Sequence, residues 1–286
     1  MILAALLFLA QDLAALSGQG AAAMREKRYP DATRVYRTLT EKDAANPMWR
    51  LNLGMALFYA GGHADAATEL SAFLRTRPQP GPAHLFLGVS WLKLQQPCQA
   101  IAPLEVALRW PKRPQSRWTE LADAYQGCKR WEPAAKAYAE AARLEPKDLR
   151  LVRQNAHCWR MARRYELARP VFASLESSYR DNAEFAFEYG DTLMRLEGAA
   201  AGLPWLQRAV ASESALLPAQ SALGRALMEL DRPADAVPYL EAATKEDPAL
   251  LLPLSRAYRA LQRLDDAAQA EAAYKAAYQP KDSLGP

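Results

Sequence analysis

Residues that carry most enzyme and metal chemistry are scarce in this sequence. It has three cysteines and three histidines, His63, His84 and His157. The histidines lie far apart, and none stands in an H-E-x-x-H or similar metal-binding spacing. No two cysteines form a C-x-x-C pair, which excludes a zinc ribbon and a thioredoxin-type redox site. We therefore expect no bound metal.

Motifs for nucleophilic catalysis and for nucleotide binding are missing as well. The chain has no G-x-S-x-G elbow and no G-x-x-x-x-G-K-[ST] phosphate loop. Residues 18–23 read GQGAAA and match G-x-G-x-x-A, but no strand precedes them and they fall where the first helix is expected. These absences predict a protein that is not an enzyme and that needs no cofactor.

The sequence also lacks clustered charge of one sign and long apolar runs. The net charge is +4, from 36 basic and 32 acidic residues spread along the chain. Nucleic-acid binding needs a clustered basic face, so we expect no nucleic-acid partner. The longest N-terminal apolar run, residues 1–10, is far shorter than the roughly 20 residues that span a bilayer, which predicts no integral membrane span.

Residues 1–10, MILAALLFLA, admit two interpretations. They resemble the apolar part of a secretory signal peptide, with a small-residue cleavage site before Gln11, and this favours an exported, periplasmic protein over a cytoplasmic one. No Lys or Arg precedes the run, however, as a signal peptide would require. In the second interpretation, residues 1–16 are the apolar start of the first helix.

What the sequence contains in abundance is a repeat with a period of 34 residues. Six units follow one another without insertion, and their first positions are Pro47, Gly81, Gln115, Leu149, Ala183 and Leu217. Position eight is always small: Gly54, Gly88, Ala122, Ala156, Gly190 and Gly224. Position 20 is small too: Ala66, Ala100, Ala134, Ala168, Gly202 and Ala236. Position 24 is always bulky: Leu70, Leu104, Tyr138, Phe172, Leu206 and Leu240.

This pattern predicts an antiparallel pair of helices in each unit. Small residues at positions eight and 20 let the two helices approach closely, and the bulky residue at position 24 fills the remaining gap. Pro78, Pro146 and Pro248 recur near position 32, where a residue without a backbone N–H ends the second helix. One pair cannot bury its apolar face alone, so the units must stack into an all-α solenoid.

The residues at these positions resemble the tetratricopeptide repeat family, whose signature is W-x2-L-G-x2-Y followed by A, F and P. The unit around residues 118–146 carries it at Trp118, Leu121, Tyr125, Ala134, Tyr138, Ala141 and Pro146. The resemblance implies a right-handed superhelical solenoid. It covers residues 11–280 in about eight units: 13–46, 47–80, 81–114, 115–148, 149–182, 183–216, 217–247 and 248–280, before a short polar tail, 281–286.

In this family the first helix of each unit lines a concave groove, with positions 2, 5, 6, 9, 12 and 13 facing inward. The resemblance therefore implies that a protein or peptide partner binds there. In the second and third units these positions form an apolar stripe, whose proposed binding residues are Asn52, Met55, Phe58, Tyr59 and Phe86. The alternative is that part of the stripe is covered by the N-terminal helix or packed between helix pairs.

The fifth unit carries an arginine ladder, which we define as Arg150, Arg153, His157, Arg160 and Arg164. Spacings of three and four residues place them on one helix face. Guanidinium groups suit carboxylates, so one hypothesis is an anchor for an acidic peptide or a C-terminal carboxylate, carried by the first four. The competing hypothesis is internal pairing with acids of the neighbouring units: Glu120, Asp123, Glu184, Glu188 and Asp191.

The cysteines raise the question of a disulfide. Cys98 falls near the start of the second helix of the third unit, and Cys128 falls at the end of the first helix of the fourth. These helix ends are neighbours in a stacked array, so a bridge is geometrically feasible, but it needs an oxidising compartment. The alternative is two separate thiols. Cys158 is interpreted as a small core residue.

Repeats without catalytic motifs predict a non-catalytic scaffold that captures a partner segment in the groove. The alternative is a structural subunit of a larger, for example envelope, assembly that docks or self-associates as a homo-oligomer. A helical regulatory arm for a separately encoded enzyme is a third hypothesis. The identity of the partner does not follow from the sequence, because this fold serves many unrelated roles.

Overall fold

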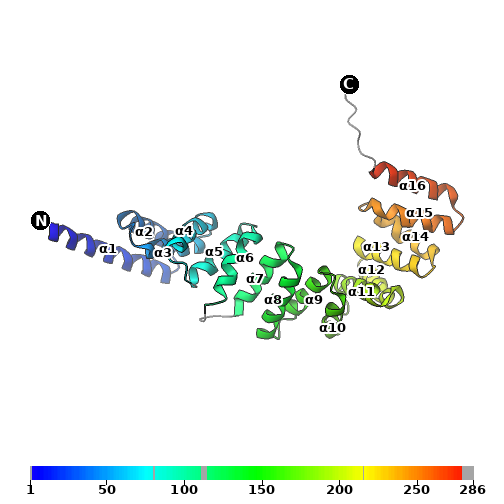
Figure 1. The fold of residues 1–286 in the computed structure, drawn as a ribbon, viewed down its shortest axis with the longest axis horizontal. Coiled ribbons are helices and arrows are strands. Elements are labelled where there is room, and N and C mark those ends of the chain that lie inside the picture. Colours follow the sequence, from blue (N-terminus) through cyan, green and yellow to red (C-terminus); the bar gives the residue numbers. More distant parts are fainter. Residues whose placement is uncertain (1, 80, 111–114, 215, 279–286) are drawn as a thin grey trace, which may run out of the picture. The chain divides into compact units, whose positions relative to one another are not determined.

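The computed structural model describes residues 2–79, 81–110, 115–214 and 216–278, apart from the side chains of 2–9, 115 and 116. Within these ranges the chain forms sixteen α-helices and one short 3-10 helix, with no strand (Figure 1). The prediction of an all-α fold of antiparallel helix pairs is confirmed. The predicted polar tail, 281–286, lies outside the described residues.

The chain divides into two compact units, residues 1–151 and 152–286. The helices of the first are α1 (Ile2–Arg25), α2 (Tyr29–Lys42), α3 (Pro47–Tyr59), α4 (His63–Thr76), α5 (Pro82–Lys93), α6 (Pro97–Ala107), α7 (Gln115–Gly127) and α8 (Trp131–Leu144). Helix α9 (Leu149–Met161) begins at the end of this unit, and most of its residues belong to the second.

The second unit continues with helices of similar length. They are α10 (Tyr165–Leu175), α11 (Ala183–Glu197), α12 (Ala199–Ser212), α13 (Leu217–Glu229), α14 (Pro233–Ala243), the 3-10 helix η1 (Pro248–Leu250), α15 (Leu251–Ala260) and α16 (Leu264–Tyr278). Consecutive helices thus make eight pairs, from α1 and α2 to α15 and α16, one for each repeat.

Small residues let the helices of a pair approach closely, as the repeat predicts. A Cβ atom added at Gly88 of α5 would lie 2.5 Å from Cγ of Leu104 in α6. A Cβ atom at Gly202 of α12 would lie 2.5 Å from the backbone oxygen of Gly190 in α11. The leucines at position 24 lie against the glycines at position eight and are fully buried: Leu70, Leu104, Leu206 and Leu240.

The turns inside the pairs repeat as strictly as the helices do, which the sequence alone did not reveal. In seven of the eight pairs, position 15 adopts a positive φ: Lys27, Gly61, Gln95, Lys129, Arg163, Asp231 and Gln262. In the sixth repeat α11 runs two residues further than the other first helices, to Glu197, and Gly198 takes the positive φ instead. Because most of these residues are not glycine, the positive φ of the turn cannot be recognised from the residue types at this position.

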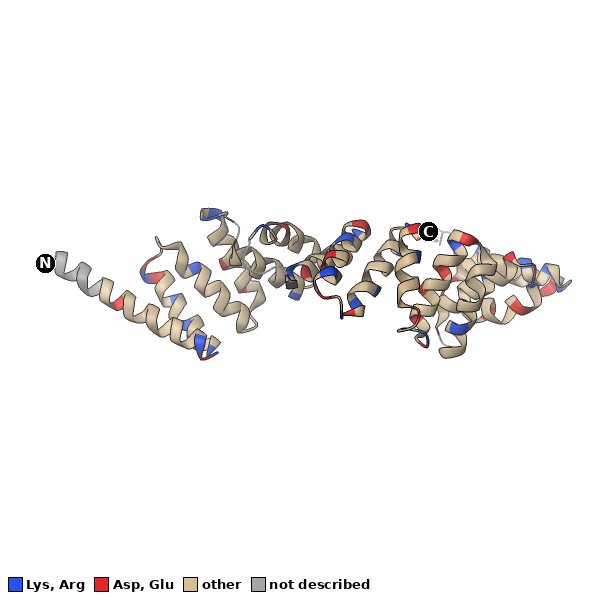
Figure 2. Cartoon of the chain, turned by 90° about the horizontal axis from the view of Figure 1, so that it is seen from below, with Lys and Arg blue, Asp and Glu red and all other residues tan. Residues whose placement is uncertain are grey.

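Helix α1 is longer than the predicted first unit, which starts at residue 13. Its backbone is helical from Ile2, and Leu13 and Leu16 pack against the core of the first unit. From Ala10 to Met24 its only charged residue is Asp12, and basic residues follow at its C-terminal end (Figure 2). The helix includes residues 2–10, but whether these also act as an export signal stays a prediction. Among the described residues, no helix is both long and apolar enough to cross a membrane.

Candidate functional site

The apolar stripe of the first unit contains a cluster of aromatic rings, which we call the aromatic patch: Tyr29, Phe58, Tyr59, His63 and Phe86. The ring of Phe58 lies 5.0 Å from that of Phe86, and the ring of Tyr59 lies 5.5 Å from Phe86. Tyr29 of α2 stacks on Tyr59 at 5.1 Å. The patch therefore joins the first two helix pairs to the third.

Only part of this stripe is accessible. Leu51 is buried, and Met55, Phe58 and Phe86 are partly buried against the core. Asn52 is half-buried. By contrast, Tyr59 and Met48 each expose 46% of their surface. The inner residues thus hold the helix pairs together, while these two side chains leave apolar surface open to solvent.

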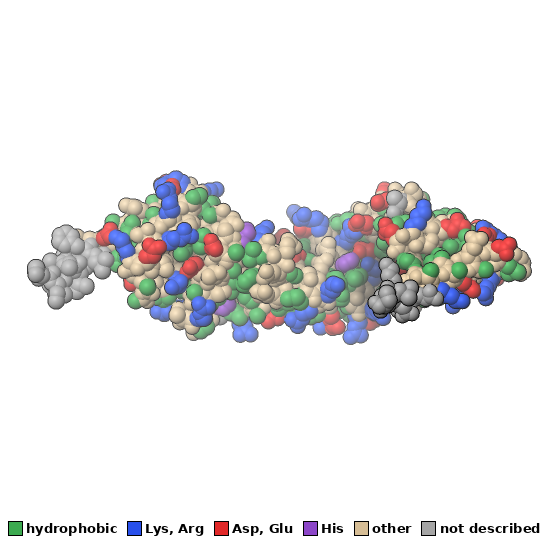
Figure 3. All heavy atoms as spheres, turned by 90° about the horizontal axis from the view of Figure 1, so that it is seen from above, with side chains coloured by type: hydrophobic (Ala, Val, Ile, Leu, Met, Phe, Trp, Pro, Cys, Tyr) green, Lys and Arg blue, Asp and Glu red, His purple; other side chains and the backbone are tan. Residues whose placement is uncertain are grey.

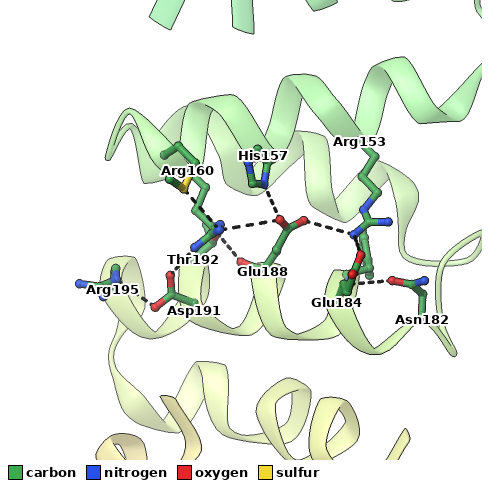
Figure 4. Close-up of polar contacts among 11 residues, drawn as sticks. Arg153, His157, Arg160, Asn182, Glu184, Glu188, Asp191, Thr192 and Arg195 are labelled. Atoms are coloured by element: carbon green, nitrogen blue, oxygen red, sulfur yellow. Dashed lines mark hydrogen bonds and ion pairs between the residues drawn. The ribbon is translucent and has the colours of Figure 1, made fainter. Parts of the chain in front are cut away.

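Three members of the arginine ladder face α11, and Figure 4 shows the side chains of Arg153, His157 and Arg160 directed at the acids of that helix. Arg153 lies 3.0 Å from Glu184, and Arg160 lies 3.0 Å from Asp191. His157 pairs through Nδ1 with Glu188. These three members of the ladder therefore have internal partners in α11.

Glu188 is the centre of this network. Besides His157, its carboxylate lies 3.7 Å from Arg153 and 3.7 Å from Arg160. Glu188 and Asp191 are buried, so their charges need compensation from these cations. The structure thus shows internal pairing with α11, as the second hypothesis for the ladder describes.

The remaining members of the ladder differ. Arg150 exposes 84% of its side chain and binds Asp148, 2.8 Å away at the start of the same helix. Arg164 lies in the turn before α10 and has a partner within the structure. Of the acids predicted on the other side, Asp123 accepts a hydrogen bond of 2.5 Å from Tyr138 in its own pair.

A cavity of about 450 Å³ adjoins the network in the second unit. Its lining comes from α9, α11, α13 and α14 and from the segment through η1: Arg160, Phe187, Asp191, Arg195, Leu217, Pro218, Ser221, Arg225, Ala243, Glu246, Asp247 and Leu250. Asp191 lies 3.0 Å from both Arg160 and Arg195, so these two cations are already engaged at the cavity wall.

Sequence reasoning identified Arg160 but missed Phe187, Arg195 and Arg225. A signal for them exists, since Phe187 stands at groove position 5 of the sixth unit and Arg225 at groove position 9 of the seventh. They are isolated along the chain, however, and only the folded structure places them around one space with Arg160. Residues spaced along one helix, such as the arginine ladder, can be recognised from the sequence, whereas residues that three different helices contribute to one cavity cannot.

A disulfide joins Cys98 at the start of α6 to Cys128 just after α7, with their Cα atoms 5.1 Å apart. Contacts around it are tight, because a Cβ atom at Gly127 would lie 2.8 Å from the Pro97 side chain. The bridge thus fastens the third helix pair to the fourth. Cys158 is buried in α9, as expected of a core residue.

Two acids of α7 are partly withdrawn from water. Desolvation, with a smaller contribution from Asp123, raises the pKa of Glu120 to about 7. Desolvation also raises the pKa of Asp123, although the hydrogen bond from Tyr138 opposes it. Elsewhere, charged side chains of both signs are interspersed with apolar ones on the face shown in Figure 3. Among the described residues, no group of three or more His, Cys, Asp and Glu is arranged to hold a metal ion.

Comparison with known protein families supports the repeat that the sequence and the helices show. The family model for the tetratricopeptide repeat matches residues 51–116 and 221–282. No curated protein sequence matches the chain.

Solved structures with a similar fold include several repeat proteins. MamA 41-end from Desulfovibrio magneticus RS-1 is 17% identical, with a TM-score of 0.51 over 57% of this chain and 95% of that one. YrrB, described as a TPR protein with an unusual peptide-binding site, is 19% identical, with a TM-score of 0.50 over 63% and 94%. A chain of the Naa15/Naa10 complex bound to HypK-THB is 14% identical, with a TM-score of 0.60 over 95% of this chain and 43% of that one.

Tetratricopeptide repeat proteins are generally non-catalytic scaffolds, and the match of the family model therefore supports a role in protein interaction. Matched residues lie in both compact units, and six of the eight helix pairs carry the strict spacing of small and bulky residues. This chain therefore carries tetratricopeptide repeats at the matched residues and folds as an array of helix pairs of that type.

Proposed function

We propose that this protein captures a segment of a protein partner on the face lined by the first helix of each repeat, and that the aromatic patch of the first unit is a main contact. The observation that carries the proposal is the exposure of Tyr59 beside half-buried Phe58 and Phe86, with Met48 exposed at the opposite end of α3. Aromatic side chains that are held by neighbours and partly open to solvent are frequent energetic centres of interfaces, since little conformational entropy is lost on binding.

The half-buried members give this surface a fixed shape. Tyr59 is held by Tyr29 on one side and by Phe86 on the other, with ring distances of 5.1 and 5.5 Å. Its ring thus presents apolar area in one orientation. A peptide that lies along α3 and packs one side chain against Tyr59 and another against Met48 would bury apolar area, at about 25 cal/mol per Å². A structural subunit that only docks or self-associates would not require binding of short peptides.

Selection from a random dodecapeptide phage library against the full chain tests the proposal. The affinity of the best peptides is then measured by calorimetry for the wild type and for the Tyr59→Ser and Met48→Ser variants. We expect each variant to weaken binding by about 1–2 kcal/mol, which is about 5- to 30-fold.

The matched control is Leu264→Ser, because Leu264 is 62% exposed at the start of α16 and lies outside the patch. This variant is expected to bind as the wild type does. Failure to select any peptide, or an equal loss in the control, would refute the proposal. Circular dichroism of each variant checks that its helices are intact.

A further inference from the structure

The cavity of the second unit contains a cation that the internal network does not use. Nε of Arg225 is fully buried and has no hydrogen-bond partner. Among the described residues, no carboxylate lies within 4.0 Å of its guanidinium, whereas Arg153, Arg160 and Arg195 all have carboxylate partners. Arg225 as a whole is half-buried, but burying its Nε–H donor without an acceptor is costly, so a function is the simplest reason to keep an arginine here.

We propose that Arg225 and the cavity wall form a second contact site, which binds a single carboxylate of the protein partner next to an apolar side chain. The proposal rests on the proposed function, because the ligand belongs to the same partner protein. It adds the chemistry that the second unit recognises.

The cavity has the two surfaces that this ligand requires. Arg225 offers a planar set of N–H donors, which matches the two oxygens of a carboxylate. Phe187, Leu217 and Leu250 supply apolar wall beside it. The volume of about 450 Å³ is within the range of cavities that take small ligands, and it is sufficient for one or two side chains.

The acids at the cavity limit the charge of the ligand. Glu246 and Asp247 line it and are exposed to solvent, and Asp247 also accepts a hydrogen bond of 3.0 Å from the backbone N–H of Ala249. They would repel a run of acidic residues or a phosphate group. One carboxylate, reaching past these acids to Arg225, is therefore preferred over a highly acidic peptide.

The test uses the full chain and three pools of random octapeptides. The first pool has a free C-terminal carboxylate and no Asp or Glu. In the second, the C-terminus is an amide and one Glu is present, and the third has the amide and no acid. Retained peptides are counted by affinity-selection mass spectrometry for the wild type, Arg225→Gln, Arg225→Lys and a control.

The control is Arg256→Gln. Arg256 stands at position 9 of the eighth unit, as Arg225 does in the seventh, but it is exposed and does not line the cavity. We expect wild type to enrich at least one carboxylate-bearing pool about tenfold over the acid-free pool. Arg225→Gln should remove this preference, Arg225→Lys should retain part of it because the charge remains, and Arg256→Gln should leave it unchanged.

Enrichment of the first pool would assign the carboxylate to a chain terminus, and enrichment of the second would assign it to a side chain. Equal retention of all pools, or a preference that survives in Arg225→Gln, would overturn the inference. If wild type retains peptides and loses them in Tyr59→Ser but without any preference for carboxylate, the proposed function stands and this inference fails. If wild type retains no peptide, both fail.

Discussion

The close contact between α11 and α12 offers a direct test of how the repeat is built. A Cβ atom at Gly202 would lie 2.5 Å from the Gly190 oxygen, 2.8 Å from Cβ of Met194 and 3.0 Å from its backbone nitrogen. Two of these three atoms belong to the backbone, so rotation of a side chain cannot relieve the overlap. The Gly202→Ala variant must therefore push the two helices apart.

The size of the effect follows from two opposing terms. Ordinary contact begins at about 3.4 Å, so the helices must separate locally by about 3.4 − 2.5 = 0.9 Å. Overpacking of this kind costs about 1–3 kcal/mol, and often the upper part of that range when the backbone must move. Alanine regains about 1 kcal/mol over glycine through helix propensity. We expect a net loss of about 1–2 kcal/mol in the free energy of unfolding.

Urea denaturation followed by circular dichroism measures this loss, with the slope of the transition checked for a change in the unfolding mechanism. The control is Gly18→Ala in α1, where a Cβ atom would have no neighbour within 4 Å. Only the propensity term applies there, so this variant should gain up to about 1 kcal/mol. A neutral or stabilised Gly202→Ala variant would refute the steric reasoning.

Three more predictions concern the turns, the disulfide and a buried acid. Lys129→Gly should raise the free energy of unfolding by about 1 kcal/mol, and Gly61→Ala should lower it similarly, because both positions have a positive φ and Gly61 has no steric neighbour; urea denaturation measures both. Replacing Cys98 and Cys128 by serine opens a loop of 30 residues and should cost about 3–4 kcal/mol; stability unchanged from the oxidised wild type would contradict this. The pKa of Glu120 is about 7 in the folded chain and 4.5 for an unperturbed carboxyl, so the stability that its proton provides is lost as the pH rises from 4.5 to about 7. Glu120→Gln should therefore stabilise the protein at pH 8 and much less at pH 4, as measured by thermal melts at both pH values.

The spacing of small and bulky residues was sufficient to predict the helix pairs. Gly88 and Leu104 show why: the size of each side chain is fixed by one contact within one pair, and that contact recurs with the period of the repeat. The pairing of the ladder was left open, because charge and spacing describe one helix and do not say which neighbour supplies the acids. The structure shows that α11 supplies them, through Glu184, Glu188 and Asp191.

Two features could not be predicted for physical reasons. Position 15 takes a positive φ with Lys, Gln, Arg or Asp, and such residues also occupy ordinary exposed positions, so composition carries no signal. Arg225 resembles any other surface arginine in the sequence. Its significance depends on the absence of a carboxylate near it among the described residues, which only three-dimensional coordinates reveal.

Site-specific photo-crosslinking tests the central claim, that a partner segment binds at the aromatic patch, most directly. A benzoylphenylalanine placed at Tyr59 in one variant and at Leu264 in another is irradiated with the tightest peptide from the phage selection. Both side chains are exposed, at 46% and 62%, so each probe has access to bound peptide. The proposed function predicts a peptide adduct at position 59 and none at 264. An adduct at 264 without one at 59 would contradict it.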